Sequence, residues 1–364
     1  MISYKQVEQL VRQNLKAIIG YIPIEPTDIL SQRVDINIEN VIKLDGNENP
    51  YGCSTGVTQA LANYKYYHNY PDPEQRELKK ALAKYCGADS ERILAGSGSD
   101  DLIDLILRLF IEPGDKVINC PPTFGMYPFC TDVCGGEAVN IPRKKDFTVD
   151  VPAIKKAIDK RTKVLFIASP NNPSGNVSSE VEILELLDTG IIIVIDEAYS
   201  EFSGHSIIPT SNKYPNLIIL RTFSKWAGLA GLRAGYGIFP ENIAKLLMKI
   251  KQPYNINIAA QIAVLESLKD IEYLHSTVKK IIDEREQLSE RLSQLSWLKI
   301  YPSKANFILC EALNGKAMYV HQELQRRGIF IRYFDTPELK DFLRISVGKP
   351  EHTNSLIAAL KEIC

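Results

Sequence analysis

The chain has 364 residues, of which 45% are hydrophobic and 24% are charged, and its formal net charge is -1. This length and composition are typical of a globular protein with a large core, divided into two domains. The balanced charge excludes an electrostatic footprint for nucleic acid or an anionic membrane, and no apolar run is long enough to span a bilayer.

The seven cysteines are scattered along the chain and fit no small disulfide framework. Cys130 and Cys134 have a spacing that is a weak zinc signal, but no second pair accompanies them. Ordinary buried thiols are therefore favoured, and no metal site is predicted. The N-terminal residues lack the apolar core of a signal peptide, so we expect a cytoplasmic protein.

Residues 1–40 combine a helical pattern with an extended arm. Apolar residues recur at helical spacing over residues 7–19. Pro23 and Pro26 then disfavour helix in the residues before them, so the arm that carries Tyr21 is predicted to be extended. A strand over residues 41–44 leads into a turn-rich run, which places Asn47 either at a substrate pocket or in a plain loop.

Helices are predicted over residues 55–64 and 74–85, and the stretch over residues 93–110 begins as a strand and turns into an apolar helix. The turn contains Gly98, Ser99 and Asp100. Free N–H groups and the dipole at such a helix start favour an anion, and Asp100 also suits a capping role. The glycine spacing is neither the Rossmann nor the P-loop pattern, which argues against a dinucleotide-binding protein.

From residue 116 to residue 220, predicted strands alternate with predicted helices. The strands cover residues 116–120, 137–141, 164–168, 191–195 and 217–220, and the helices cover residues 151–158 and 181–187. This rhythm is typical of an α/β fold with a parallel or mostly parallel sheet and helices on both sides. Phe124, Asn172, Asp196 and Tyr199 follow the strands, at the ends where such sheets bind ligands.

The last part of the chain has a different pattern. A long helical region covers residues 258–295, and strands near residue 300 and over residues 306–310, 329–333 and 343–347 alternate with helices over residues 316–327 and 352–363. These elements predict a smaller α+β unit. We therefore divide the chain into an N-terminal arm (1–40), a large domain (41–257) and a small domain (258–364).

Lys225 stands in an unusual stretch. An apolar strand ends at Leu220, and Thr222 and Ser224 precede the lysine. A desolvated lysine amine can form a Schiff base, and two hydroxyls with Arg233 nearby suit the phosphate of a cofactor. The alternative for this stretch alone is a polar turn between two elements.

The residues at the neighbouring strand ends complete a set that suits a pyridine ring. Asp196 can pair with the ring nitrogen, and Asn172 and Tyr199 can donate hydrogen bonds to the ring oxygen. Phe124 can cover one face of the ring. Taken singly, Asp196 could be a helix cap, Asn172 a turn residue and Phe124 a core residue, but together with Lys225 they favour a cofactor site.

A series of motifs carries a resemblance to a known family. The motifs are LDGNENPYG (44–52), YPDP (70–73), GSGSDD (96–101), PPTFGMY (121–127), SPNNPSG (169–175), DEAY (196–199), TFSK (222–225) with GLR (231–233), and LRISVG (343–348). In this order the chain resembles the fold-type I pyridoxal-phosphate aminotransferases of the aspartate aminotransferase superfamily, and most of all the histidinol-phosphate aminotransferases. The resemblance implies a large domain with a mostly parallel seven-stranded sheet flanked by helices, and a smaller α+β domain.

The resemblance also implies how pyridoxal 5'-phosphate is bound. Lys225 would hold the cofactor as a Schiff base and shuttle protons, and Asp196 would pair with the pyridine nitrogen. Tyr199 and Asn172 would contact the ring oxygen, and Phe124 would stack on the ring. The residues implied around the cofactor phosphate are Gly98, Ser99, Asp100, Thr222, Ser224 and Arg233, with Tyr70 reaching it from the other subunit of a homodimer.

The implied reaction transfers an amino group between glutamate or 2-oxoglutarate and imidazole-acetol phosphate or L-histidinol phosphate, in histidine biosynthesis. Arg344 matches the arginine that binds the donor carboxylate. Tyr21 and Arg332 match the contacts to the substrate phosphate, and Asn47 is placed at the same pocket. The family arm has glycine where this chain has Ile24, and the alternative for Arg332 is a solvated charge on an edge strand.

Other functions on the same scaffold are threonine-phosphate decarboxylation and the transamination of aromatic or branched amino acids. Because its substrate is phosphorylated, the decarboxylase is the closest of these alternatives, and its product distinguishes it from the implied reaction: carbon dioxide release instead of transfer to 2-oxoglutarate. A pyridoxal-phosphate-binding transcription regulator would need a fused DNA-binding module. Residues 1–40 contain no basic recognition helix, so this function is disfavoured.

Overall fold

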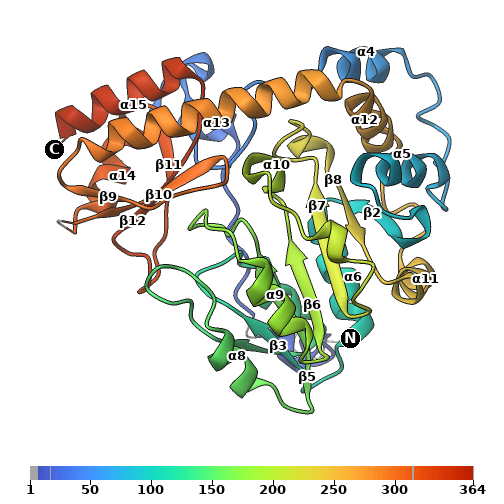
Figure 1. The fold of residues 1–364 in the computed structure, drawn as a ribbon. Coiled ribbons are helices and arrows are strands. Elements are labelled where there is room, and N and C mark those ends of the chain that lie inside the picture. The colour runs from blue at the N-terminus through green and yellow to red at the C-terminus, as the bar shows by residue number, and fades with distance from the viewer. Residues whose placement is uncertain (1–6, 17, 314, 364) are drawn as a thin grey trace.

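The computed structural model describes residues 7–16, 18–313 and 315–363. They form two sheets with helices packed around them, and the long helix α13 (Ile271–Ser293) extends across both regions (Figure 1). Among the described residues, no helix combines the length and the apolarity that crossing a membrane requires.

The larger sheet has seven strands in the order β2-β8-β7-β6-β5-β3-β4. All neighbouring strands are parallel except β8, which is antiparallel to both β2 and β7. This arrangement confirms the predicted mostly parallel seven-stranded sheet. The strands are β2 (Ile93–Ser97), β3 (Lys116–Asn119), β4 (Glu137–Asn140), β5 (Thr162–Ala168), β6 (Ile192–Asp196), β7 (Leu217–Thr222) and β8 (Ala234–Ile238).

Helices cover both faces of this sheet. They are α4 (Thr55–Asn63), α5 (Arg76–Cys86), α6 (Ser99–Phe110), α7 (Met126–Cys134), α8 (Val151–Ala157), α9 (Glu180–Leu187), α10 (Ser200–Ser203), α11 (Glu241–Ile250) and α12 (Ile258–Lys269). Along β6, Val194 belongs to one core cluster, whereas Ile193 and Ile195 belong to the other, because side chains alternate along a strand. Helices α6, α7 and α11 pack in the first cluster, and α5, α8, α9 and α12 pack in the second.

The smaller sheet has five strands in the order β1-β11-β12-β10-β9. Strand β1, from the start of the chain, pairs in parallel with β11, and the other neighbours are antiparallel. The strands are β1 (Ile42–Leu44), β9 (Leu298–Ile300), β10 (Phe307–Ala312), β11 (Ile329–Tyr333) and β12 (Phe342–Ser346), and the accompanying helices are α13, α14 (Ala317–Arg326) and α15 (Pro350–Ile363). The division of the chain at residues 40 and 257 stays a prediction.

Some elements differ from the sequence patterns. Strand β8 and helices α7 and α11 are not among the predicted elements. Strand β8 contains Gly235 and Gly237, which interrupt any apolar alternation. A Cβ atom on Gly235 would lie 2.6 Å from the carbonyl carbon of Gly98, so the close approach of two backbone segments requires glycine there.

The N-terminal region also differs. The continuous helix predicted over residues 7–19 is absent from the described residues, where α2 covers Gln13–Lys16. The side chains of Leu10 and Ile19 are 85% and 86% exposed, so burial does not stabilise a longer helix. After the extended arm, α3 (Thr27–Val34) begins directly behind Pro26, because proline restricts the residue before it and tolerates a helix after it.

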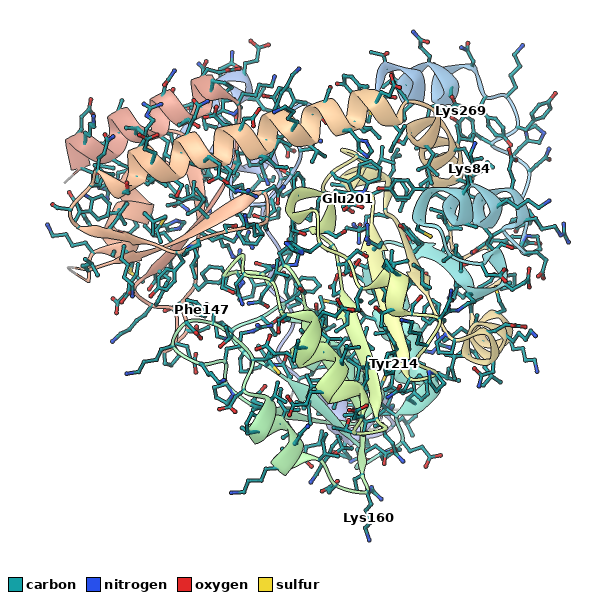
Figure 2. All side chains as sticks on the ribbon, viewed as in Figure 1. Lys84, Phe147, Lys160, Glu201, Tyr214 and Lys269 are labelled. Atoms are coloured by element: carbon teal, nitrogen blue, oxygen red, sulfur yellow. The ribbon has the colours of Figure 1, made fainter. Side chains whose placement is uncertain are left out.

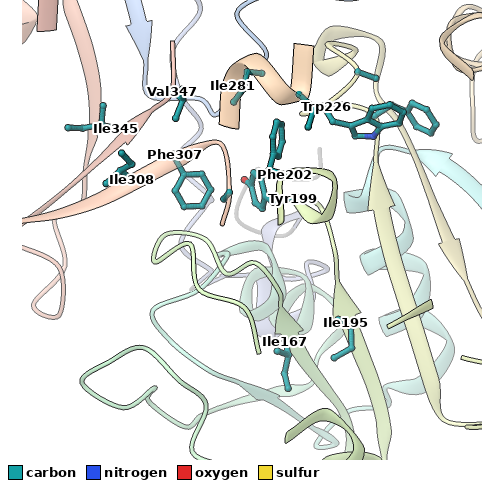
Figure 3. Close-up of a cluster of buried hydrophobic side chains, with 14 of the residues drawn as sticks. Ile167, Ile195, Tyr199, Phe202, Trp226, Ile281, Phe307, Ile308, Ile345 and Val347 are labelled. Carbon is teal, nitrogen blue, oxygen red and sulfur yellow. The ribbon is translucent and has the colours of Figure 1, made fainter. Parts of the chain in front are cut away.

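A buried hydrophobic cluster joins the two sheets (Figure 3). It includes Ile167 and Ile195 from the larger sheet and Ile345 from the smaller one. The rings of Tyr199 and Phe307 meet edge to face in this cluster, with centroids 5.0 Å apart. Because Tyr199 follows β6 and Phe307 begins β10, this contact fixes the edge of one sheet against the other.

Charged side chains are divided between surface and interior. Lys84, Lys160 and Lys269 project outward into solvent, whereas Glu201 lies inside the molecule (Figure 2). Glu201 forms an ion pair with Arg221 at 2.8 Å, and both side chains are less than a tenth exposed. A buried charge of this kind needs a partner, since desolvation is costly.

Candidate active site

A cavity of about 400 Å³ opens at the carboxyl ends of the parallel strands of the larger sheet. Ala168, Asp196 and Thr222, the last residues of β5, β6 and β7, all line it. This is the edge where parallel sheets place their ligands. The predicted site residues in the lining are Tyr21, Asn47, Ser99, Asp100, Phe124, Asn172, Asp196, Tyr199, Thr222, Ser224, Lys225, Arg233 and Arg344.

Gly98, Tyr70 and Arg332 lie outside this lining. Gly98 is the residue directly before α6, so it borders the cavity through Ser99. Tyr70 is 80% exposed and stacks on Tyr254, with ring centroids 4.3 Å apart. Arg332 lies beside the N-terminal arm, where its Nη2 atom donates to the carbonyl oxygen of Ile22 at 3.5 Å.

Lys225 reaches the cavity from the loop after β7. Its Nζ atom donates to the carbonyl oxygen of Gly46 at 3.0 Å, and within the described part of the chain no carboxylate forms an ion pair with it. Burial, together with the nearby Arg344 guanidinium, lowers the pKa of Lys225 from 10.5 to about 8. The neutral, nucleophilic form of this amine is therefore more populated near neutral pH than in an ordinary lysine.

Asp196 is buried at the end of β6. The Tyr127 hydroxyl donates to its Oδ2 atom at 2.7 Å, and the Ala198 N–H donates to its Oδ1 atom at 3.1 Å. Burial raises the pKa of Asp196 from 3.8 to about 6, although the Tyr127 hydrogen bond offsets part of this rise. A carboxyl group in this state gains a counter-charge when a cationic ring nitrogen binds beside it.

The start of α6 forms an anion site with Arg233. No side chain caps this helix, so its first N–H groups remain available to a ligand. Arg233 donates through Nη2 to Asp100 Oδ2 at 2.8 Å. A Cβ atom on Gly98, where φ is 81°, would lie 2.5 Å from that Nη2 atom, so glycine leaves room for the guanidinium.

Two hydroxyl groups at the end of β7 complete this anion site. Thr222 Oγ1 donates to Ser224 Oγ at 3.0 Å, and Arg233 Nη1 donates to the same Ser224 oxygen at 3.4 Å. Both hydroxyls line the cavity, as do Ser99 and Asp100. A guanidinium, two hydroxyls and a helix start together suit a phosphate group.

Arg344, on β12 of the smaller sheet, is a buried guanidinium that also lines the cavity. It donates through Nη1 to Asn172 Oδ1 at 2.6 Å and through Nη2 to the carbonyl oxygen of Asp45. Burial lowers its pKa. Among the described residues no carboxylate pairs with it, and its Nε atom has no hydrogen-bond partner. This geometry leaves Arg344 able to bind a carboxylate from outside the chain.

Tyr199 and Phe124 approach the cavity from the strand ends. The Tyr199 hydroxyl accepts a hydrogen bond from Asn47 Nδ2 at 3.0 Å. Phe124 meets the ring of Tyr21 edge to face, with centroids 6.2 Å apart, so the N-terminal arm lies against this part of the cavity. Tyr21 itself lines the cavity, and its role as a substrate contact stays a prediction.

The residues present fit pyridoxal 5'-phosphate. The anion site suits its phosphate, the buried Asp196 carboxyl suits its ring nitrogen, and the desolvated Lys225 amine suits its aldehyde. The chemistry of these donors and their arrangement around one cavity leave no charged group of the cofactor without a partner.

The lining also contains residues to which the sequence patterns assign no site role, among them Gly46, Glu48, Met126 and Tyr127. Tyr127 lies within the motif at 121–127, three residues after Phe124, which is the signal that could have pointed to it. Gly46 contributes only a carbonyl oxygen, and residue type does not reveal such a role.

Comparisons with known proteins agree with this geometry. The model of the family "Aminotransferase class I and II" matches residues 39–360. A histidinol-phosphate aminotransferase from Dehalococcoides mccartyi is 50% identical over 357 residues, which is 98% of each chain.

Solved structures also share the fold of this chain. The histidinol-phosphate aminotransferase from Sinorhizobium meliloti, in complex with pyridoxal-5'-phosphate, superposes with a TM-score of 0.88 at 26% identity over 97% of each chain. An L-threonine-O-3-phosphate decarboxylase from Porphyromonas gingivalis shares the fold, with a TM-score of 0.77 at 22% identity over 88% of this chain and 99% of that one. The chain therefore belongs to the class I and II aminotransferases, which depend on pyridoxal phosphate, and within them to the histidinol-phosphate aminotransferases.

Proposed function

We propose that this protein transfers an amino group between glutamate or 2-oxoglutarate and imidazole-acetol phosphate or L-histidinol phosphate, as a step of histidine biosynthesis. The observation that carries the proposal is the cavity that brings together the Lys225 amine, the Asp196 carboxyl and the Arg344 guanidinium. The similarity to histidinol-phosphate aminotransferases over almost the whole chain supports the choice of substrate.

Each part of the cofactor has a proposed partner. Lys225 would hold the aldehyde carbon, Asp196 the ring nitrogen, and Phe124 one ring face, while Tyr199 and Asn172 would contact the ring oxygen. The residues proposed at the phosphate are Ser99 and Asp100 through their N–H groups, with Gly98, Thr222, Ser224 and Arg233. When bound, the cofactor supplies a protonated ring that withdraws electrons from a carbon bearing an amino group.

Lys225 is the proposed proton carrier. Its pKa of about 8 leaves a neutral fraction that can take a proton from the substrate carbon. The protonated amine can then donate that proton to a different atom. The Gly46 carbonyl, 3.0 Å from Nζ, holds the amine on the cavity side of its loop.

Asp196 is proposed to keep the ring nitrogen protonated. The Tyr127 hydroxyl and the Ala198 N–H fix the two carboxylate oxygens, at 2.7 Å and 3.1 Å, and the carboxyl group lines the cavity. A buried carboxylate with a fixed position stabilises a cation without reorganisation of solvent, and this favours electron withdrawal through the ring.

The substrate end is proposed to use two arginines. Arg344 would bind the glutamate carboxylate with its planar fork, which Asn172 and the Asp45 carbonyl hold in place. Histidinol phosphate has a phosphate and no carboxylate, and Tyr21 with Arg332 would bind that phosphate. Arg332 contacts the carbonyl of Ile22, the residue after Tyr21, so the arm connects these two groups.

Two alternative activities remain as outcomes of the test. Threonine-phosphate decarboxylase is one, because its substrate also carries a phosphate; the likeness to the solved decarboxylase is one of fold alone. Aromatic-amino-acid transamination is the other, and the aromatic wall formed by Tyr21 and Phe124 is the observation in its favour.

We also propose a cytoplasmic homodimer. Tyr70 lies on the surface and outside the cavity of its own chain. Its stacking on Tyr254 holds the ring in an outward position, from which it can reach the cofactor phosphate of a second subunit. Size measurement in solution, with and without Tyr70→Ala, tests this assembly.

The substrate is tested by an amino-transfer assay on the purified protein loaded with pyridoxal 5'-phosphate. L-histidinol phosphate and 2-oxoglutarate should yield glutamate, with a higher kcat/KM than L-phenylalanine as donor. Arg332→Gln should raise the KM for histidinol phosphate about tenfold, because a charged hydrogen bond to phosphate is lost, and should leave the KM for glutamate unchanged. Arg76→Gln, at a side chain that is 71% exposed, is the matched control.

Carbon dioxide release from phosphothreonine, without glutamate formation from histidinol phosphate, would replace the proposal with the decarboxylase. A higher kcat/KM for L-phenylalanine would replace it with the aromatic aminotransferase.

A further inference from the structure

Asn47 lies in a buried hydrogen-bond network between the two sheets. Its φ is 53°, in the left-handed region that residues other than glycine rarely adopt. Asn47, Ser346 and Asn306 are 1%, 2% and 0% exposed. A strained backbone of this kind persists only where its surroundings hold it, so the contacts of Asn47 require an explanation.

Ser346, on β12, holds Asn47 through two hydrogen bonds. The Asn47 N–H donates to Ser346 Oγ at 2.9 Å, and the Ser346 hydroxyl donates to Asn47 Oδ1 at 2.9 Å. Asn306 Nδ2 donates to the Asn47 carbonyl oxygen, also at 2.9 Å. Within the described part of the chain, Asn47 supplies both partners of the Ser346 hydroxyl, whose single hydrogen therefore goes to Oδ1.

The direction of the Ser346 hydrogen bond determines which side-chain atom of Asn47 faces Tyr199. With Oδ1 occupied by Ser346, the side-chain group that faces Tyr199 is Nδ2, which donates to the Tyr199 hydroxyl oxygen at 3.0 Å. Tyr199 is the acceptor in this contact, and its own hydrogen has no acceptor among the described residues. Because Tyr199 lines the cavity, that hydrogen is available to a ligand there.

We infer that Ser346 is a positioning residue, which through Asn47 makes Tyr199 a hydrogen-bond donor to the ring oxygen of the cofactor. The inference rests on the proposed function, in which Tyr199 contacts that oxygen. Ser346 is absent from the cavity lining, so it acts through Asn47 and touches no ligand itself.

The physical reason is that a side-chain amide can either donate through its nitrogen or accept through its oxygen. Without the Ser346 hydroxyl, the Asn47 amide can turn over and present Oδ1 to Tyr199 at no steric cost. Oδ1 would then accept the Tyr199 hydrogen, and the ring oxygen would lose one of its two proposed donors. Ser346 disfavours this second arrangement, because a turned amide would leave the hydrogen of the buried serine hydroxyl without an acceptor.

The test is a pH titration of the absorbance of the bound cofactor in Ser346→Ala. A hydrogen bond donated to the ring oxygen favours its anionic form, so its loss should raise the pKa of the absorbance change by about one unit. Ser346→Thr keeps the hydroxyl and should retain the wild-type pKa. Ser267→Ala is the control. It removes a buried hydroxyl on α12 that has no hydrogen-bond partner among the described residues, and it should leave the pKa unchanged.

A second pair of variants covers the case in which Ser346→Ala does not fold. Ser346→Thr and Ser346→Val have nearly the same shape and differ in the hydroxyl, so the valine variant alone should show the raised pKa. Thermal unfolding of each variant separates loss of the fold from loss of the hydrogen bond.

The failures of the inference and of the proposed function are distinguishable through Tyr199→Phe. A raised pKa in Tyr199→Phe with a wild-type pKa in Ser346→Ala would overturn the positioning role and leave the Tyr199 contact intact. A wild-type pKa in Tyr199→Phe would instead contradict the contact between Tyr199 and the ring oxygen.

Discussion

Arg221 and Lys225 are cations that lie four positions apart, at the end of β7 and just after it, but their surroundings differ. Arg221 forms ion pairs with Glu197 at 2.7 Å and with Glu201 at 2.8 Å. Burial lowers the pKa of Arg221, but these two carboxylates outweigh burial and raise it. Lys225 has a carbonyl oxygen as its partner, and burial lowers its pKa to about 8.

The difference separates a structural ion cluster from a reactive site. A buried cation with two carboxylates and further hydrogen bonds has a fixed charge, and it holds β6 and β7 together at Glu197 and Arg221. A buried charge without a counter-ion costs free energy, and it is tolerated where a ligand supplies the missing partner. Among the described residues, none of Asp196, Arg344 and the partly buried Lys225 forms an ion pair, so all three belong to this second kind.

The largest expected effect is that of Lys225→Ala on the reaction. The rate of glutamate formation should fall about 10⁴-fold, because the general base is removed. Unfolding of the cofactor-free variant in urea should need no less denaturant than the wild type, since a desolvated amine without a counter-ion is lost. Lys84→Ala, on the surface, is the control, and a cofactor adduct reducible by borohydride in Lys225→Ala would contradict the assignment.

Arg221→Met should have the next largest effect, and on stability. The variant leaves Glu197 and Glu201 buried without their cation, which should lower the free energy of unfolding by about 3–5 kcal/mol. Urea unfolding of the cofactor-free protein measures this loss. Arg76→Met, which removes an exposed ion pair, should cost less than about 1 kcal/mol. Equal losses in the two variants would remove the distinction between the ion cluster and an ordinary surface pair.

The pH dependence of stability tests Asp196. Burial raises its pKa from 3.8 to about 6, so between these values the folded protein binds more protons than the unfolded chain. The free energy of unfolding of the cofactor-free protein should therefore fall as the pH rises through this window. Asp196→Asn should remove the fall and exceed the wild type by on the order of 2 kcal/mol above the window. Parallel pH profiles of the two proteins in urea unfolding would show that Asp196 does not carry this cost.

The smallest expected effect is that of Arg344→Lys on substrate binding. Lysine keeps the charge but cannot form the bidentate contact, so the KM for glutamate should rise about tenfold. The KM for histidinol phosphate should stay unchanged, because that substrate has no carboxylate. Steady-state kinetics with each substrate varied separately decide the matter, and equal rises in both KM values would argue against a carboxylate-specific role.

Much of the fold follows from local patterns. The β-branched run at 191–195 predicts β6, and the helical spacing after Ser99 predicts α6, because the periods of strands and helices are properties of contiguous residues. Strand β8 could not be found in this way. Its Gly235 is required by the close approach of the Gly98 turn, which is distant in the sequence.

The candidate site likewise combines residues that short motifs indicate with contacts that only the folded chain creates. Lys225, Asp196 and Arg233 stand within short motifs, which predict them as site residues, and all three line the cavity. Tyr127 lies in a quoted motif, but its contact with Asp196 spans 69 positions and could not be predicted from either residue.

The sequence thus predicts the candidate cofactor-binding residues, because each motif is contiguous and carries its chemistry in its residue types. The properties of those residues required the tertiary structure. The lowered pKa of Lys225 and the raised pKa of Asp196 arise from burial, which no local pattern specifies. The hydrogen-bond direction at Tyr199 depends on Ser346 and Asn47, which are 299 positions apart and meet only when β12 packs beside the segment that follows β1.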